Sequence, residues 1–128
     1  MRQTIGLLAV DRSDCVLFVK KQKWWILPGG KPEGGESEEE CLRREIGEEL
    51  PGVTVSDATR LGSVCGVSPI TRSDIELVVY GGKIIGPVRP AAEIQEARWV
   101  PLDRVDEYHL SDLTRAAIGR FLLSRQDS

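Results

Sequence analysis

Three glutamates, Glu45, Glu48 and Glu49, stand at i, i+3 and i+4 directly after Arg44. In an α-helix such positions project from one narrow face. Like charges at these spacings repel by about 0.2–0.5 kcal/mol per pair on an exposed helix, so a cation is expected to offset them. Carboxylate oxygens are the hard ligands that Mg²⁺ prefers. The stretch therefore predicts a divalent metal site; the alternative is a solvated acidic helix face with Arg44 as a surface ion-pair partner.

The segment around these glutamates carries the signals of a helix start and a helix stop. Ser37 followed by Glu40 is a capping box, so the helix is expected to begin at about Glu38. The glutamates of its first turn are favoured there by the helix dipole and need no functional explanation. An apolar stripe follows at helical spacing: Leu42, Ile46 and Leu50. Pro51-Gly52 is expected to end the helix, whose apolar face should pack on a sheet.

Short β-branched and aliphatic runs flank this helix. Thr4–Val10 and Cys15–Lys20 are predicted to form a β-hairpin, and Trp24–Ile26 a short strand that the next glycines end. Further strands are predicted at Val53–Val55, Arg60–Val67, Asp74–Ile85 and Glu96–Val100. Gly81-Gly82 suits a tight hairpin turn or a bulge. A final amphipathic helix is predicted from Leu113, Ala117, Ile118, Phe121 and Leu122. Hairpins with two isolated helices indicate an α+β domain with a mixed sheet between helices.

Length and composition limit what the whole chain can be. With 128 residues, 41% hydrophobic and 29% charged, it fits one soluble domain over residues 1–128. A net charge of −3 provides no basic footprint for a nucleic-acid polymer. Three cysteines match no metal or redox spacing and predict reduced thiols in a cytoplasmic protein: Cys15, Cys41 and Cys65. The apolar run Ile5–Val10 is too short for a signal-peptide core or a membrane span, so no membrane partner is expected.

A longer pattern includes the acidic helix. Gly30 is followed after five residues by Glu36, and after seven more by the run Arg44–Glu49, which reads REIGEE. This spacing resembles the Nudix box, and the preceding WWILPGG resembles the usual lead-in to that box. Pro51 stands where the pattern has a glycine, and Gly52-Val53 restore it one residue late. The departure follows the last carboxylate and therefore concerns the loop more than the metal site. A phosphate-binding P-loop is excluded, because the lysine followed by Ser or Thr is missing.

The resemblance implies a Nudix hydrolase with a mixed β-sheet sandwiched between α-helices, using Mg²⁺ or, as a substitute, Mn²⁺. It implies that three carboxylates and one backbone carbonyl hold the metal: Glu45, Glu48, Glu49 and Gly29. Arg44 is expected to orient a carboxylate through an ion pair, for which its planar fork is suited. Gly30 and Glu36 are expected to support the loop and the helix. The catalytic candidates are Arg44, Glu45, Glu48 and Glu93.

Glu93 is a candidate because it lies six residues before Trp99, in a stretch that resembles the downstream Nudix segment with a further glutamate. It is expected to act as an additional metal ligand or as the general base. The same stretch contains Glu96, and whether either glutamate has that role is left open. The alternative is that both simply solvate a loop.

Other residues have weaker chemical interpretations. Trp24, Trp25 or Tyr80 could stack on a nucleobase, but buried aromatic side chains usually belong to the core. The single histidine, His109, is expected to be a surface or packing residue, because function must be argued from a constellation of groups. The residues that bind the substrate are not predicted.

A compact chain with few insertions resembles the MutT-like nucleoside triphosphate pyrophosphohydrolases, which release a nucleoside monophosphate and pyrophosphate. The predicted function is thus Mg²⁺-dependent cleavage of the pyrophosphate bond of a small nucleotide by a monomer or homodimer. One alternative is an ADP-ribose or nucleotide-sugar pyrophosphatase, for which Pro69 lies slightly past the expected proline. Another is a Nudix module that binds nucleotides without catalysis. The complete set of box glutamates and the arginine favours an enzyme.

Overall fold

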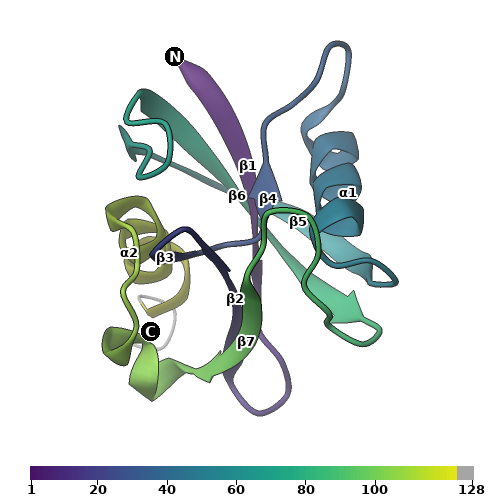
Figure 1. Cartoon of the computed structure of the whole chain (residues 1–128), viewed down its shortest axis with the longest axis vertical. Coiled ribbons are helices and arrows are strands. Elements are labelled where there is room, and N and C mark those ends of the chain that lie inside the picture. The colour runs from purple at the N-terminus through teal and green to yellow at the C-terminus, as the bar shows by residue number, and fades with distance from the viewer. Residues whose placement is uncertain (124–128) are drawn as a thin grey trace.

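The computed structural model describes residues 1–123 of the chain (Figure 1). Its elements are β1 (Arg2–Ala9), β2 (Cys15–Lys21), β3 (Trp24–Ile26), β4 (Gly29–Gly30), α1 (Glu38–Glu49), β5 (Thr54–Val67), β6 (Asp74–Ile85), β7 (Glu96–Pro101), a 3₁₀ helix η1 (Leu102–Glu107), α2 (Asp112–Ile118) and a π-helical turn η2 (Gly119–Leu123). The strands form a four-stranded sheet in the order β4-β1-β6-β5 and a three-stranded sheet in the order β3-β2-β7. The predicted α+β class is confirmed.

The four-stranded sheet is mixed, because β1 pairs with β6 in parallel, whereas the pairs β1–β4 and β5–β6 are antiparallel. The predicted hairpin of β1 and β2 is wrong beyond its turn: the two strands belong to different sheets, and their antiparallel pairing is limited to the bridge between Val10 and Val16. Both strands are continuous apolar runs, and each lies in the middle of its sheet with a neighbour on either side. Such continuous apolar runs are typical of strands that are buried on both faces.

The strand β5 replaces the two strands predicted at Val53–Val55 and Arg60–Val67. It is one long strand with two shifts in its pairing to β6, and the extra residues of both shifts are on β5. Asp57, at the first shift, has a left-handed backbone with φ of 56°. Gly81-Gly82 form neither a turn nor a bulge; β6 continues through them, and the bulge lies on the facing strand.

The helix α1 confirms the prediction at its start. Ser37 is the N-cap, its hydroxyl accepts from the Glu40 N–H at 3.1 Å, and Glu40 accepts from the Ser37 N–H at 2.9 Å. The predicted apolar stripe is buried in one core cluster against the four-stranded sheet: Leu42, Ile46 and Leu50. The helix ends at Glu49, and Pro51-Gly52 lie in the turn that follows, so the departure from the box pattern does not reach the carboxylates.

The helix α2 covers the opposite face of the four-stranded sheet, on the left of Figure 1, while α1 lies on the right. Alternate residues of β6 show this division: Leu77 and Val79 belong to the cluster with α2, and Val78 and Tyr80 to the cluster with α1. The predicted C-terminal helix is confirmed, with its last part wound as η2; residues 124–128 lie outside the described residues.

The pair Gly29–Gly30 is a further correction. The sequence predicts that these glycines only end a strand, yet they form β4, which pairs with Ile5 and Gly6 of β1. A two-residue strand carries no periodicity, so the pattern could not reveal it. This pairing attaches the loop before α1 to the edge of the sheet.

The three cysteines are free, as predicted: Cys15, Cys41 and Cys65. No helix within residues 1–123 is long and apolar enough to cross a membrane. The cytoplasmic location stays a prediction.

Candidate active site

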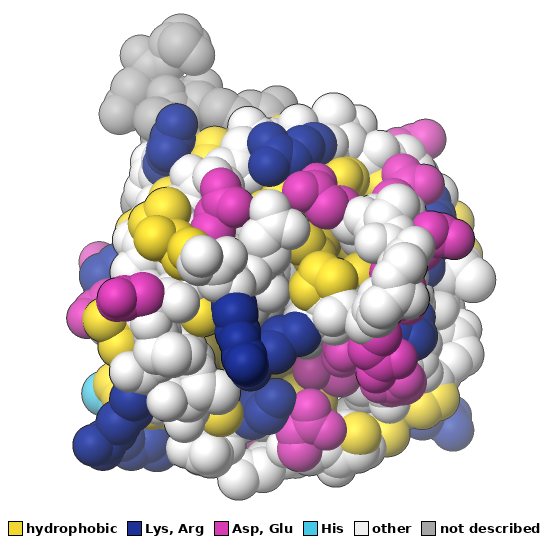
Figure 2. All heavy atoms as spheres, turned by 90° about the horizontal axis from the view of Figure 1, so that it is seen from above, with side chains coloured by type: hydrophobic (Ala, Val, Ile, Leu, Met, Phe, Trp, Pro, Cys, Tyr) yellow, Lys and Arg dark blue, Asp and Glu magenta, His cyan; other side chains and the backbone are white. Residues whose placement is uncertain are grey.

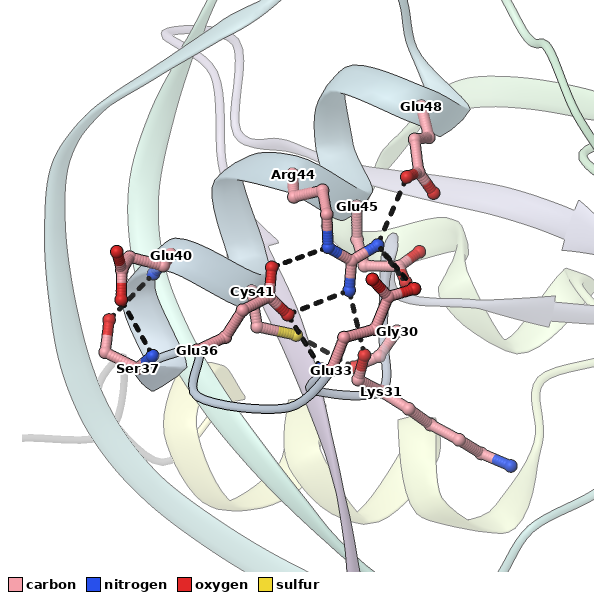
Figure 3. Close-up of polar contacts among 10 residues, drawn as sticks. All are labelled: Gly30, Lys31, Glu33, Glu36, Ser37, Glu40, Cys41, Arg44, Glu45 and Glu48. Atoms are coloured by element: carbon pink, nitrogen blue, oxygen red, sulfur yellow. Dashed lines mark hydrogen bonds and ion pairs between the residues drawn. The ribbon is translucent and has the colours of Figure 1, made fainter.

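Arg44 is the centre of the polar contacts of α1 (Figure 3). Its Nε donates to Glu36 Oε2 at 2.6 Å and its Nη2 to Glu36 Oε1 at 3.0 Å, so the fork holds this carboxylate bidentately. Its Nη1 donates to Glu45 Oε1 at 3.0 Å and to Glu48 Oε1 at 3.2 Å. The bond to Arg44 lowers the pKa of Glu36, and the same bond raises the pKa of Arg44. One guanidinium therefore joins the loop to the helix and orients two of the three predicted ligands.

The strand β4 leaves no room for side chains next to α1. A Cβ on Gly29 would collide with the Ile5 carbonyl oxygen, and its φ of 147° is one that other residues rarely adopt. A Cβ on Gly30 would collide with the Glu45 carboxylate. The Gly30 backbone is not left-handed, so its need for glycine is purely steric. The Glu45 carboxylate therefore lies directly against the backbone of β4.

Glu49 is the one buried acidic side chain among the described residues, with 2% of its surface exposed. Its Oε1 accepts a hydrogen bond from the Gly29 N–H at 3.0 Å. Burial raises the pKa of Glu49 to about 8, and the charges of Glu45 and Glu93 add to this effect. Burial also raises the pKa of Glu45, although Arg44 opposes it. A bound cation would offset the cost of ionising these desolvated carboxylates.

Glu93 lies in the loop before β7, and the structure brings it to the same region. Lys21 Nζ stands 3.0 Å from Glu93 Oε1, and this contact lowers the pKa of the carboxyl group. Glu93, Lys21 and Glu45 line one cavity. Glu96, the other candidate, lies on β7, forms a 3.2 Å ion pair with Arg98 and does not line this cavity. Geometry therefore distinguishes two glutamates that the sequence left equivalent.

The carboxylates are not arranged around a common point. Within residues 1–123, no group of three or more Asp, Glu, His or Cys side chains is placed to hold one metal ion. Cationic side chains hold them instead: Arg44 contacts Glu45 and Glu48, and Lys21 contacts Glu93. Their chemistry nevertheless fits a hard divalent cation, because all the candidate side-chain donors are carboxylate oxygens. The buried Glu49 and the partly buried Glu45 have raised pKa values, so a cation would stabilise their charged forms most.

A cavity of about 310 Å³ opens beside these carboxylates. Its polar end includes Glu45, Glu93, Lys21, Lys31 and the two glycines of β4. Its apolar wall is formed by Ile26, Leu27, Ile75, Leu77 and Leu113. The remaining lining residues are Thr4, Gly6, the loop 68–71, Ser111 and Thr114. In Figure 2, acidic side chains gather beside Lys and Arg side chains, and hydrophobic side chains are visible between them. The cavity thus combines a charged end with an apolar interior, as ligand sites commonly do.

The aromatic candidates lie elsewhere, since none of the three lines the cavity. Trp25 is buried and meets the Tyr108 ring edge-on, with centroids 5.2 Å apart. Tyr80 is buried and donates to Glu38 Oε1 at 2.9 Å. Trp24 stacks on His109 with ring centroids 4.2 Å apart, which confirms a packing role for the histidine.

Sequence reasoning missed several residues that line the cavity. Lys21 ends a strand and resembles any solvated lysine, so no local signal distinguishes it. Lys31 directly follows the glycine pair, and its position beside the box could have singled it out. The loop 68–71 lies between two predicted strands and carries no signal of its own, and Ser111 offers only a helix-capping signal. These residues are separated by long stretches of sequence and meet only in the folded chain.

Comparison with known proteins agrees with this fold. The NUDIX domain model matches residues 1–121, and the chain belongs to the Nudix family. A protein of two Mycobacterium tuberculosis strains, named "Putative 8-oxo-dGTP diphosphatase 2", is 33% identical over 106 residues, which cover 74% of this chain and 72% of that protein. The chain is accordingly a hydrolase of phosphoric anhydrides.

Solved structures show the same architecture. The MutT Nudix hydrolase of Burkholderia pseudomallei has a TM-score of 0.82 and 27% identity, covering 93% of this chain and 96% of that one. A MutT protein of Methanosarcina mazei Go1 has a TM-score of 0.81 and 23% identity, covering 99% and 95%. The second likeness is evidence of fold alone.

Proposed function

We propose that this protein is a Mg²⁺-dependent nucleoside triphosphate pyrophosphohydrolase that releases a nucleoside monophosphate and pyrophosphate. The observation that carries the proposal is the charged end of the cavity, where Glu45 and Glu93 face the same space as Lys21 and Lys31. Carboxylates suit a metal ion, and ammonium groups suit phosphate oxygens. The name of the mycobacterial relative, an 8-oxo-dGTP diphosphatase, also favours a nucleoside triphosphate over other anhydrides.

The proposed metal ligands are Glu45, Glu48, Glu49 and the Gly29 carbonyl, with Mg²⁺ or Mn²⁺ as the cation. When bound, this ion would neutralise the phosphate charge and lower the pKa of a coordinated water. Arg44 would keep Glu45 and Glu48 in a fixed orientation, since it already bonds to both at 3.0 and 3.2 Å.

The proposed reaction is attack of water on a phosphorus atom, with cleavage of one phosphoric anhydride bond. Glu45 and Glu93 are the candidates for the group that takes the proton of this water, because both line the cavity. Each of the two is held by a cation through one oxygen: Glu93 Oε1 stands 3.0 Å from Lys21 Nζ, and Glu45 Oε1 accepts from Arg44 Nη1 at 3.0 Å. The leaving phosphate groups would lie near Lys31, which forms no ion pair among residues 1–123.

A nucleotide panel tests the proposal. Nucleoside triphosphates, ADP-ribose and UDP-sugars are incubated with Mg²⁺ or with EDTA, and the products are separated by ion-exchange chromatography. We expect monophosphate and pyrophosphate from a triphosphate, in Mg²⁺ only. If only ADP-ribose or a nucleotide sugar is hydrolysed, the protein is a pyrophosphatase of that class and the proposed nucleoside triphosphate activity is wrong. Binding without hydrolysis of any compound would identify a non-catalytic module.

Glu48→Gln provides the matched variant for the site. It keeps the shape of the side chain and removes its charge at a position that is more than half exposed, so folding should be unaffected. Most of the Mg²⁺-dependent rate should be lost. A wild-type rate would remove Glu48 from the proposed metal site.

A further inference from the structure

Ser111 and Thr114 form a pair of buried hydroxyl groups in the wall of the cavity. They are 1% and 2% exposed, and both border the cavity. Ser111 Oγ accepts a hydrogen bond from the Thr114 N–H at 3.1 Å and donates to Thr114 Oγ1 at 2.8 Å. Within residues 1–123 neither hydroxyl has another hydrogen-bond partner. The two hydroxyl groups have two hydrogens but form only one hydrogen bond with each other, which uses the hydrogen of Ser111. The hydroxyl hydrogen of Thr114 therefore has no bond.

Helix capping explains only half of this pair. Ser111 is the N-cap of α2, which accounts for its bond to the Thr114 N–H. The Thr114 hydroxyl has no such role, and valine would fill the same space. Among residues 1–123 the Thr114 hydroxyl has no hydrogen bond other than the one it accepts from Ser111, so its own hydrogen has no acceptor. An unsatisfied buried donor costs about 1–3 kcal/mol, which a ligand acceptor would recover.

The position of the pair indicates which part of a ligand it meets. Glu45 and Thr114 both line the cavity. Glu45 belongs to α1 and Thr114 to α2, and these helices lie on opposite faces of the four-stranded sheet (Figure 1). If the phosphates occupy the end with the carboxylates and lysines, the base extends along the apolar wall towards Thr114. This step rests on the proposed function.

We propose that the Thr114 hydroxyl determines base specificity and selects nucleotides that present a carbonyl oxygen, rather than an amino group, at this end of the cavity. A carbonyl oxygen accepts the remaining hydrogen and satisfies every donor of the pair. An amino group brings a further donor and no acceptor. Whether Ser111 donates to Thr114 or Thr114 donates to Ser111, one hydroxyl hydrogen of the pair stays without a hydrogen bond. The site therefore rejects the wrong base by leaving buried polar groups unpaired.

The test compares Thr114→Val, which keeps the shape and loses the hydroxyl, with Thr114→Ser, which keeps the hydroxyl and loses the methyl group. Inosine and adenosine monophosphates serve as probes, because one has a carbonyl group where the other has an amino group. Calorimetry on the full chain should show that the wild type binds the inosine compound about tenfold tighter or more. Thr114→Ser should retain this ratio. Thr114→Val should reduce this ratio towards one. The Ser111 hydroxyl cannot replace the missing donor, because its Oγ lies 2.8 Å from the position of Thr114 Oγ1.

Thr114→Ala is a second variant without the hydroxyl, for use if Thr114→Val melts well below the wild type. If the folded variant without the hydroxyl keeps the wild-type ratio of affinities for the two compounds, the inference is wrong. It is also wrong if Thr114→Ser loses the preference as fully as Thr114→Val, because the shape of the side chain would then determine the preference. Wild-type protein that binds neither probe, or prefers the adenosine compound, would overturn it too. Binding of a monophosphate needs no turnover. Failure of the proposed hydrolysis would therefore appear separately, as absence of pyrophosphate release with the binding ratio intact.

Discussion

Gly30→Ala should damage the candidate site through one added methyl group. The new Cβ would overlap the Glu45 carboxylate, which must move away from β4 and from its 3.0 Å bond to Arg44 Nη1. Overpacking of this kind costs about 1–3 kcal/mol of folding free energy. A displacement of about 1 Å at a catalytic group can reduce the rate about 100-fold. We therefore expect Mg²⁺-dependent kcat/KM to fall by about two orders of magnitude, with a modest loss of stability.

Gly47→Ala is the matched control, because it adds the same methyl group to the same stretch. A Cβ on Gly47 would meet nothing within 4 Å, and this residue lies in the interior of α1. Alanine is favoured over glycine there by about 1 kcal/mol, so the variant should be slightly more stable than the wild type and equally active.

Thermal unfolding in EDTA and steady-state hydrolysis of the substrate found in the nucleotide panel provide the two readouts. The variants should change Tm in opposite directions, and only Gly30→Ala should lose activity. Wild-type kcat/KM in Gly30→Ala would refute the placement of the Glu45 carboxylate against β4. An equal loss of activity in Gly47→Ala would show that the helix tolerates no change and would remove the steric argument.

Three further variants address the charges of the site. Metal-free protein should lose stability as pH rises from about 5 to about 8, because Glu49 has a folded pKa of about 8 against an ordinary 4.5 and so retains its proton longer when folded. Denaturant titrations in EDTA should show this slope, and a slope just as steep in Glu49→Gln would contradict it. Lys21→Met removes the cation 3.0 Å from Glu93, so calorimetric Mg²⁺ affinity should rise several-fold; unchanged affinity would mean that Lys21 does not compete with the metal. Arg44→Lys keeps the positive charge but loses the bidentate hydrogen bonds to Glu36, so kcat/KM should drop about tenfold. An unchanged kcat/KM would mean that these two bonds are not needed for activity.

The sequence alone was sufficient for the elements whose signals are local. The capping box at Ser37, the apolar stripe that includes Ile46, and the turn residues after Leu50 all act within a few positions, and α1 begins and ends as they predict. The spacing of the box is equally local. Because a helix converts spacing directly into direction, the sequence could place Arg44 on the same face as Glu48.

Strand pairing was less predictable, because sequence neighbours need not be sheet neighbours. The first two strands separate into different sheets, and β4 is visible only through its pairing with β1. The bulge beside Asp57 belongs to β5, although the glycines that suggested it belong to β6. Each of these features depends on which chain segment lies opposite, and no residue pattern within a segment contains that information.

The candidate site shows the same division. The sequence determined the box from Gly30 to Glu49 and the type of chemistry, since carboxylates at helical spacing carry their geometry with them. Only the tertiary structure brought Lys21, at the end of β2, and Glu93, in the loop before β7, to the cavity beside that helix, and excluded Glu96 from it. The hydroxyl hydrogen of Thr114 is likewise meaningful only in the fold, because burial, and not residue type, leaves it without an acceptor.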